Sequence, residues 1–174
     1  MDLGELIAGH QSNLYAFIYR MTGDRYLSED LMQETFVRAL RASRSYRAEG
    51  RLSAWLFGIA ANLLKDHWRK QQYRSSAGLI DTGVEKARQG RLSDDSPEEC
   101  ALARADVQRL RGALLDLPFE QRAPLVLHYY HDLSYEDIAR GLVIPIGTVR
   151  SRIHNGKARL RRLLEEGGYE DGRD

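Results

Sequence analysis

The stretch from Ser134 to Leu164, SYEDIARGLVIPIGTVRSRIHNGKARLRRLL, constrains the fold more than any other part of the chain. Ser134 is a typical helix N-cap, and acidic residues follow it in the first turn, where the helix dipole favours negative charge. Gly141 suits the end of this short helix. Pro145 suits the first position of a second helix, because its missing N–H is not needed there. Two short helices joined by a tight turn are therefore predicted.

The second of these helices has a divided surface. Its apolar residues recur at helical spacing and predict one buried stripe: Val149, Ile153, Leu160 and Leu163. Most other positions face outward, and from them come the candidate DNA contacts: Thr148, Arg150, Ser151, Arg152 and Asn155. The segment from Arg150 to Arg162 holds six Lys or Arg residues and no acid. This pattern favours a DNA-reading helix-turn-helix over the alternative, an ordinary helical hairpin with a solvated basic face.

Composition sets limits on this interpretation. The chain has 174 residues, enough for one domain or two small ones, and its formal net charge is only +1. A nucleic-acid interface must therefore come from local segregation of charge.

The lone cysteine, Cys100, allows no intrachain disulfide, and its role stays open. The longest apolar run, Trp55 to Ala61, is too short to span a bilayer, and the N-terminus lacks signal-peptide features, so we expect a cytoplasmic protein without membrane insertion.

The N-terminal part reads as three amphipathic helices. The first has apolar residues at three- and four-residue steps up to Met21 and ends at Gly23. Ser28 is predicted to cap the second, with these residues on its inner face: Leu31, Thr35, Phe36, Ala39 and Leu40. Ser53 is predicted to cap a third, long helix with this apolar side: Trp55, Leu56, Ile59, Ala60, Leu63 and Trp68. Asn62 falls on another face and, on the residues alone, is a surface position.

The C-terminal part follows a segment rich in Ser, Gly and Asp at residues 75–95, which reads as a flexible linker. Ser96 and Pro97 then open a helix whose expected stripe is Ala103, Val107, Leu110, Leu114 and Leu117. The next helix, about 120–131, packs Val126, Leu127 and Tyr130 inward, with Pro124 causing a kink or a late start. No strand pattern occurs. The prediction is an all-α chain of two small helical domains, residues 1–74 and 96–166, with a frayed tail at 167–174.

Catalytic patterns are absent from the sequence. The Gly-Lys pair at 156–157 lacks the rest of a phosphate-binding loop, and neither Cys-x-x-Cys nor His-Glu-x-x-His occurs. His128 and His131 are three residues apart, but two histidines without a third ligand are more typical of surface or half-buried positions than of a metal site. We therefore expect no enzyme activity, no cofactor and no metal.

Three motifs in sequence order give the chain a family resemblance. SEDLMQETF from Ser28 to Phe36 resembles the region-two signature of the extracytoplasmic-function sigma factors of bacterial RNA polymerase. WLFGIAANLLKDHWR from Trp55 to Arg69 is similar to the adjoining helix, and the segment from Leu117 to Leu164 looks like region four. Three matches in the right order, with the right gap, are much more specific than one.

The resemblance implies roles for particular residues. It implies that Asp30, Gln33 and Glu34 dock on the clamp of core RNA polymerase. It further implies that the 46–53 loop and the helix carrying Asn62, Lys65 and Arg69 hold an unstacked base of the melted minus-ten non-template strand. The helix-turn-helix would read the minus-thirty-five element as duplex. The implied partners are core polymerase, promoter DNA and an anti-sigma factor.

Two departures from the family pattern and one alternative remain. Val143 stands where the family often has Gly, so we expect the turn to differ in detail. Gly156 lies inside the recognition helix, where it costs roughly 1 kcal/mol relative to Ala and is expected to remove a phosphate contact. The alternative function is a free-standing helix-turn-helix transcriptional regulator whose N-terminal half senses a ligand or dimerises.

Overall fold

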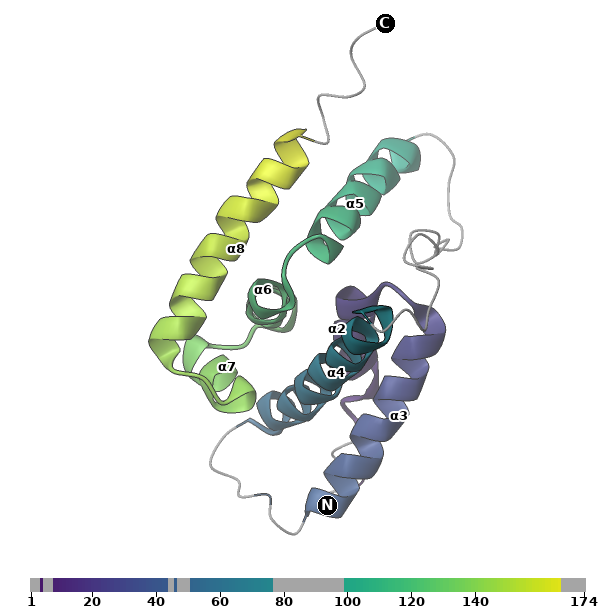
Figure 1. Ribbon diagram of the computed structural model, residues 1–174, viewed down its shortest axis with the longest axis vertical. Coiled ribbons are helices and arrows are strands. Elements are labelled where there is room, and N and C mark those ends of the chain that lie inside the picture. Colours follow the sequence, from purple (N-terminus) through teal and green to yellow (C-terminus); the bar gives the residue numbers. More distant parts are fainter. Residues whose placement is uncertain (1–3, 5–7, 44–45, 47–50, 77–98, 167–174) are drawn as a thin grey trace, which may run out of the picture.

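A computed structural model describes residues 4, 8–43, 46, 51–76 and 99–166, with only the backbone at 75–76 and 99–103. Within these residues the regular elements are α-helices, as predicted. The first set comprises α2 (Gln11–Thr22), α3 (Arg25–Ala42) and α4 (Leu52–Ser76). The second set comprises α5 (Glu99–Leu115), α6 (Phe119–His131), α7 (Tyr135–Leu142) and α8 (Ile146–Glu166). Figure 1 shows α3 and α8 on opposite sides of the molecule, with α4, α6 and α7 between them.

The first set packs around α2, whose inner face is fully buried. Its largest buried side chains are Leu14, Phe17, Ile18 and Met21, at 0% exposure, and each contributes about 1.5–3 kcal/mol through burial. Gly23 ends α2 in the left-handed conformation and donates its N–H to the carbonyl of Tyr19, which confirms the predicted stop.

The start of α3 differs from the prediction. Asp24, and not Ser28, is the N-cap: its carboxylate accepts a hydrogen bond of 3.0 Å from the N–H of Leu27. Ser28 lies inside the helix, buried, with its hydroxyl 2.8 Å from that of Thr22. Both Asp24 and Ser28 are good capping residues, and the packing of Ser28 on Thr22 selects the earlier start.

Smaller corrections concern helix bounds and faces in the first set. Leu40, predicted to face inward, is 52% exposed, because the inner stripe of α3 runs through Leu31, Thr35 and Ala39. Helix α4 starts at Leu52, so Ser53 is its second residue rather than its cap. The same helix continues to Ser76.

In the second set, α8 packs against α5, α6 and α7. Helix α6 already begins at Phe119, with Pro118 at the N-cap position, and Pro124 lies inside it, so the late start expected from Pro124 is wrong. Val126 and Leu127 are buried as predicted, whereas Tyr130 is 39% exposed. Val107, expected in the stripe of α5, is 51% exposed, and that helix turns its later residues, Leu110 and Leu114, inward.

Several predictions lie outside the described residues. They include the capping box at Ser96, most of the 75–95 linker and the tail at 167–174. The side chain of Cys100 is also outside them.

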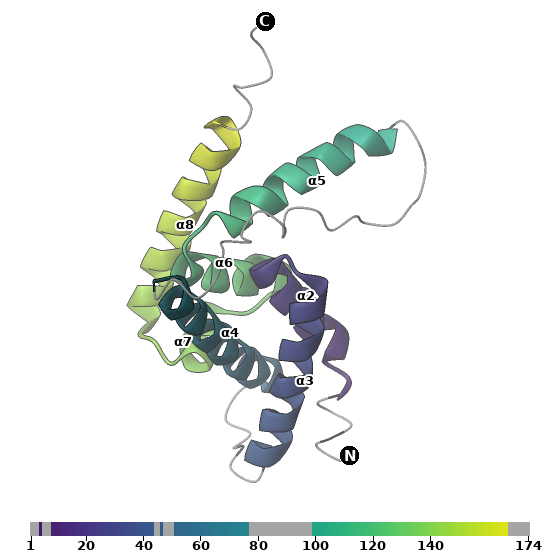
Figure 2. The same cartoon turned by 45° about the vertical axis from the view of Figure 1, so that its right-hand side comes forward.

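The two sets of helices also pack against each other. Buried residues of α2 and α4 belong to one apolar cluster with Leu133, Ile138 and Val149 of the second set. Helix α7 lies on α4, and α2 contacts both α5 and α6. Figure 2, turned by 45°, shows the same neighbours, with α4 beside α7 and α2 beside α6.

Candidate nucleic-acid and polymerase interfaces

The helix-turn-helix is held by local capping. Ser134 is the N-cap of α7, and its hydroxyl oxygen accepts from the N–H of Asp137 at 3.1 Å, as predicted. Val143 follows α7 with φ 54° and ψ 51°, a left-handed conformation that costs a β-branched residue about 1–2 kcal/mol. Pro145 then precedes α8, and its carbonyl accepts from the N–H groups of Thr148 and Val149. The turn thus holds α8 against α7.

The outward face of α8 carries most of the predicted DNA contacts. Arg150, Ser151 and Asn155 are exposed, and Thr148 is half-buried. Val149 and Ile153 are buried on the opposite side, so the predicted division of the helix is confirmed. This face can offer hydroxyl, amide and guanidinium groups to base edges and phosphates.

Arg152 is positioned differently from Arg150. Its guanidinium lies 3.4 Å from the carboxylate of Glu120 on α6, and 28% of its side chain is exposed. This ion pair holds Arg152 at the edge of the outward face, whereas Arg150 lies on the open surface.

Gly156 has a packing role that the sequence did not reveal. It is buried, and a Cβ at this position would lie 3.1 Å from Cδ1 of Leu125 and 3.4 Å from Cβ of Gln121. Glycine therefore allows α8 to lie close to α6. The expectation that Gly156 removes a phosphate contact is wrong, because this position faces the core.

The predicted strand-capture residues share one face of α4. Asn62, Lys65 and Arg69 are all exposed and lie three and four residues apart, which brings them together on the helix surface. Arg69 is 3.8 Å from Asp66, an exposed pair that leaves most of its side chain in water. Burial lowers the pKa of His67, on the same helix, and Lys70 adds to this effect. The ring of His67 is therefore neutral near pH 7 and adds no cation to this face.

The predicted polymerase-docking residues lie on α3. Asp30 and Gln33 are exposed, while Glu34 is half-buried and bonded to Arg38 at 2.8 Å. Glu34 and Arg38 are one helical turn apart, and their ion pair is exposed to solvent. Such a pair holds the carboxylate only weakly. The outer side of α3 therefore presents acidic and amide groups suited to a basic partner surface.

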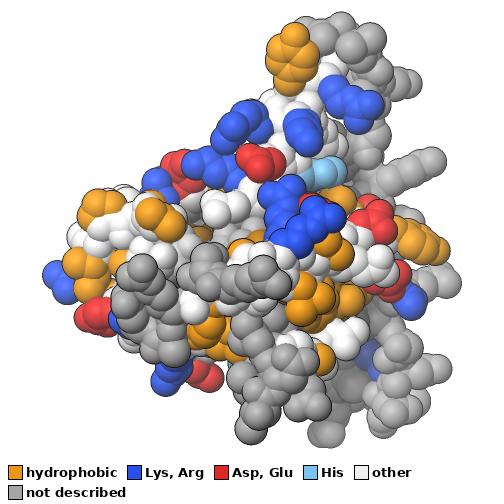
Figure 3. All heavy atoms as spheres, turned by 90° about the horizontal axis from the view of Figure 1, so that it is seen from below, with side chains coloured by type: hydrophobic (Ala, Val, Ile, Leu, Met, Phe, Trp, Pro, Cys, Tyr) orange, Lys and Arg blue, Asp and Glu red, His pale blue; other side chains and the backbone are white. Residues whose placement is uncertain are grey.

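Charge is segregated on the surface even though the chain is almost neutral. Seen from below the view of Figure 1, Lys and Arg side chains gather in a band with a few acids among them (Figure 3). Such a band supplies the local attraction for phosphate that a net charge of +1 cannot.

Sequence reasoning missed the residues that join the two helix sets. Arg51 reaches from the start of α4 to Asp137, with Nε 3.7 Å from Oδ2, and donates to the carbonyl of Asp132 at 3.3 Å. Gly58 and Gly141 meet where α4 crosses α7. A glycine inside a helical pattern is a signal of close approach, and it could have marked both positions.

Among the residues that the structure describes, no group of three or more His, Cys, Asp or Glu side chains could hold a metal ion. None of the helices in those residues is long and apolar enough to cross a bilayer.

Comparisons with known proteins agree with this arrangement. The family model for Sigma-70 region 2 matches residues 6–74, and that for Sigma-70 region 4 matches residues 107–160. The ECF RNA polymerase sigma factor SigE of Mycolicibacterium smegmatis is 37% identical over 92% of this chain and 60% of its own length. SigW of Bacillus subtilis is 32% identical over 93% of this chain and 88% of its own length.

Solved structures extend the likeness to the fold. The sigma factor RpoE from Bartonella quintana, in complex with the anti-sigma factor NepR, matches with a TM-score of 0.75 and 27% identity, covering 94% of this chain and 97% of RpoE. CnrH, in complex with the cytosolic domain of CnrY, shares the fold with a TM-score of 0.65 and 24% identity, covering 94% of this chain and 87% of CnrH. These matches give no support to a free-standing regulator. With both sigma regions in order and relatives matched over nine-tenths of its length, this chain belongs to the ECF sigma factors, which direct bacterial RNA polymerase to promoters.

Proposed function

We propose that three surfaces of this chain divide the work of promoter recognition. The outward face of α8 reads the minus-thirty-five element as duplex. The exposed face of α4, with the residues from Tyr46 that precede it in the chain, captures the melted minus-ten non-template strand. The outer side of α3 docks on core RNA polymerase. The chain itself catalyses no reaction and acts with the polymerase in the cytoplasm.

One observation carries this proposal: α8 is buried on one side and polar on the other, and α7 holds it by a capped turn. A helix held in this way can enter the major groove of about 12 Å without unpacking its core. Arg150 is the candidate for a bidentate contact with a base or a phosphate, since its side chain lies on the open surface. The guanidinium of Arg152 has to leave Glu120 before it can add a second contact.

The strand-capture role of α4 rests on exposure and chemistry. Unstacking a base costs a few kcal/mol, so a protein that opens a duplex has to hold the extruded base. Asn62 can donate to and accept from a base edge, and Lys65 and Arg69 can follow the backbone of the same strand. Trp55 lies half-buried at the start of α4, with its ring centre 4.8 Å from that of Tyr46 and the two rings tilted by 45°, so aromatic groups adjoin this face.

An anti-sigma factor is part of the proposal. RpoE, whose fold matches this chain, was solved in complex with an anti-sigma factor, NepR. The likeness to RpoE extends over both halves of the chain, since it covers 94% of it. We infer that a protein of this class also holds this sigma factor inactive.

Run-off transcription tests the proposal. Core RNA polymerase is incubated with genomic promoter fragments, with and without the purified chain. We expect discrete transcripts only in the presence of the chain. Transcripts that are the same with and without it would refute the proposal.

A further inference from the structure

Arg150 and Arg152 lie on different flanks of α8. Two residues along an α-helix turn the direction of a side chain by about 200°, so the two guanidinium groups leave the helix on nearly opposite sides. Ser151 and Asn155 lie between these flanks, on the outward face. The major groove is about 12 Å wide and a helix with its side chains about 10–12 Å across. A helix in the groove therefore turns its centre to the base edges and its flanks to the phosphate walls.

The cation on the second flank is paired within the protein. Nη2 of Arg152 lies 3.4 Å from Oε2 of Glu120, the second residue of α6. Close packing of α6 on α8 fixes this approach, because Gln121 and Leu125 lie against Gly156, one helical turn beyond Arg152. The rigid contact between the two helices therefore places the carboxylate of Glu120 beside this flank.

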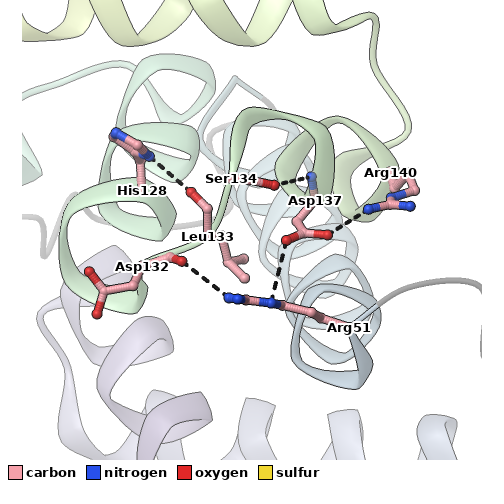
Figure 4. Close-up of polar contacts among 7 residues, drawn as sticks. All are labelled: Arg51, His128, Asp132, Leu133, Ser134, Asp137 and Arg140. Carbon is pink, nitrogen blue, oxygen red and sulfur yellow. Dashed lines mark hydrogen bonds and ion pairs between the residues drawn. The ribbon is translucent and has the colours of Figure 1, made fainter.

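The Glu120 pair is looser than the ion pairs of α7. Figure 4 shows the carboxylate of Asp137 between Arg140, at 2.7 Å, and Arg51, at 3.7 Å. The Asp137 side chain is only 8% exposed, so losing its partners would leave a buried charge. The Glu120 side chain is 58% exposed, and its distance to Arg152 exceeds that of an ordinary N–H···O hydrogen bond. Water can replace either partner, so this pair is reversible.

A DNA phosphate competes with Glu120 for the same guanidinium. Each phosphate that a protein neutralises releases about 0.9 counterion from B-DNA, and this term supplies essentially all of non-specific binding. While Arg152 is paired with Glu120, its flank offers no net positive charge to the groove wall. The exposed carboxylate also repels an approaching phosphate. The pair therefore weakens a contact that would be the same for every DNA sequence.

We propose that Glu120 is a positioning residue for duplex reading, which holds Arg152 off the DNA backbone and so withholds one sequence-independent phosphate contact. This inference rests on the proposed function of α8. A genome offers about 10⁶–10⁹ competing non-specific sites, so a contact shared by all duplexes holds the chain at DNA that is not a promoter. Without that contact, the groups at the centre of the outward face supply a larger share of the binding.

Glu120→Gln in the full chain tests the proposal, because it removes the charge and keeps the shape of the side chain. Glu136→Gln is the matched control: Glu136 is the second residue of α7, is also exposed, and carries the same charge in the same part of the chain. Both substitutions remove an acid from the first turn of a helix, so their effects on the helix dipole should be alike. A third variant combines Glu120→Gln with Arg152→Ala, and Arg152→Ala alone is its reference.

Fluorescence anisotropy at salt concentrations from about 50 to 200 mM measures binding, over the range in which phosphate contacts change affinity most. The probes are the minus-thirty-five duplex of a promoter found by run-off transcription and a scrambled duplex of the same length and base composition. Circular dichroism checks that all variants keep the helical spectrum of wild type.

We expect Glu120→Gln to steepen the slope of log affinity against log salt by about 0.9 on both probes. Its gain in affinity over wild type should therefore grow about 3.5-fold as salt falls from about 200 to about 50 mM. The ratio of promoter to scrambled affinity should stay the same, because the added contact is to a phosphate. Glu136→Gln should keep the wild-type slope, and Glu120→Gln should have no effect on the slope when Arg152 is Ala.

Contrary outcomes separate this inference from the function on which it rests. An unchanged slope in Glu120→Gln would overturn the inference, since Arg152 would then already contact a phosphate in wild type. A gain that persists without Arg152, or that Glu136→Gln reproduces, would assign the effect to general loss of negative charge and reject the role of the pair. A gain confined to the promoter duplex would make Arg152 a base contact and reject the withheld phosphate.

The reading role of α8 has its own refutation in the same data. Equal affinity of wild type for promoter and scrambled duplex would refute that role, whereas the slope of Glu120→Gln on the scrambled duplex would still decide whether the pair withholds a phosphate contact. A chain that binds neither duplex in any variant would overturn both.

Discussion

The titration of His131 should couple the stability of this protein to pH. The ring lies 4.7 Å from that of Phe57 and 6.0 Å from that of Phe17, between the two halves of the molecule. The pKa of His131 is lowered from 6.5 to about 4, chiefly by burial and also by the charge of Arg20, while Asp132 opposes both. The unfolded chain therefore binds a proton more readily than the folded one between pH 6.5 and 4. Stability should be fully present above pH 6.5 and fall as the pH drops through this window.

The expected loss follows from this shift. At pH 5 a shift from 6.5 to about 4 would lower the free energy of unfolding by about 2 kcal/mol relative to pH 7.5 for a fully buried ring. The ring is only half-buried, and solvent screening reduces the loss to about 1 kcal/mol. For a chain of this size, that corresponds to about 2–4 °C in melting temperature.

Thermal unfolding of wild type and His131→Phe at several pH values provides the assay. Phe keeps an aromatic ring between Phe17 and Phe57 but does not titrate. The titration of His67 is present in both proteins and cancels in the comparison. From pH 7.5 to pH 5, the melting temperature of the variant should rise by about 2–4 °C relative to wild type. Parallel curves for the two proteins would show that His131 does not titrate as its burial requires.

Three further substitutions test separate parts of the structure. Asp24→Ala removes the cap that accepts from Leu27 and should lower the free energy of unfolding by about 1 kcal/mol in denaturant titration; an unchanged midpoint would reject the cap. Glu34→Lys breaks an exposed pair with Arg38, which costs at most about 1 kcal/mol of stability, but should weaken retention by core polymerase in a pull-down. Equal retention of both forms would exclude Glu34 from docking. Arg150→Ala should lower affinity for minus-thirty-five duplex by about 1–3 kcal/mol and relax specificity if Arg150 contacts a base, or lower the salt slope by about one unit if it contacts a phosphate. Binding isotherms at several salt concentrations distinguish these outcomes, and no change in either would remove Arg150 from the interface.

The sequence by itself determined the features that depend on near neighbours. The cap at Ser134, the stop at Gly23 and the stripe of Val149 and Ile153 follow from interactions within one or two helical turns. The division of α8 into a buried and an outward face was predicted for the same reason. So was the all-helical class, since periodicity is a local property of the chain.

Tertiary structure decided the features in which local signals are ambiguous. Asp24 and Ser28 are both capping residues four positions apart, and only the contact of Ser28 with Thr22 selects the earlier start. Gly156 reads as a weak point in a helix, yet the close approach of Leu125 requires a small residue there. In each case the atoms that decide the outcome, the hydroxyl of Thr22 and the side chain of Leu125, belong to a neighbouring helix. The residue pattern along a single helix therefore cannot predict the contact.

The contact between the two halves was decided by tertiary structure alone. Gly58 and Gly141 are 83 positions apart; in the sequence Gly58 looks like a destabilising residue within its helix, and Gly141 looks like the end of its helix. Their meeting depends on how two separately formed helix sets are oriented in space. In the sequence, Arg51 similarly reads as one more cation of a basic segment. Only the structure shows that its Nε lies 3.7 Å from the carboxylate of Asp137. Local propensity forms the helices, and long-range packing determines which of their faces remain open to DNA.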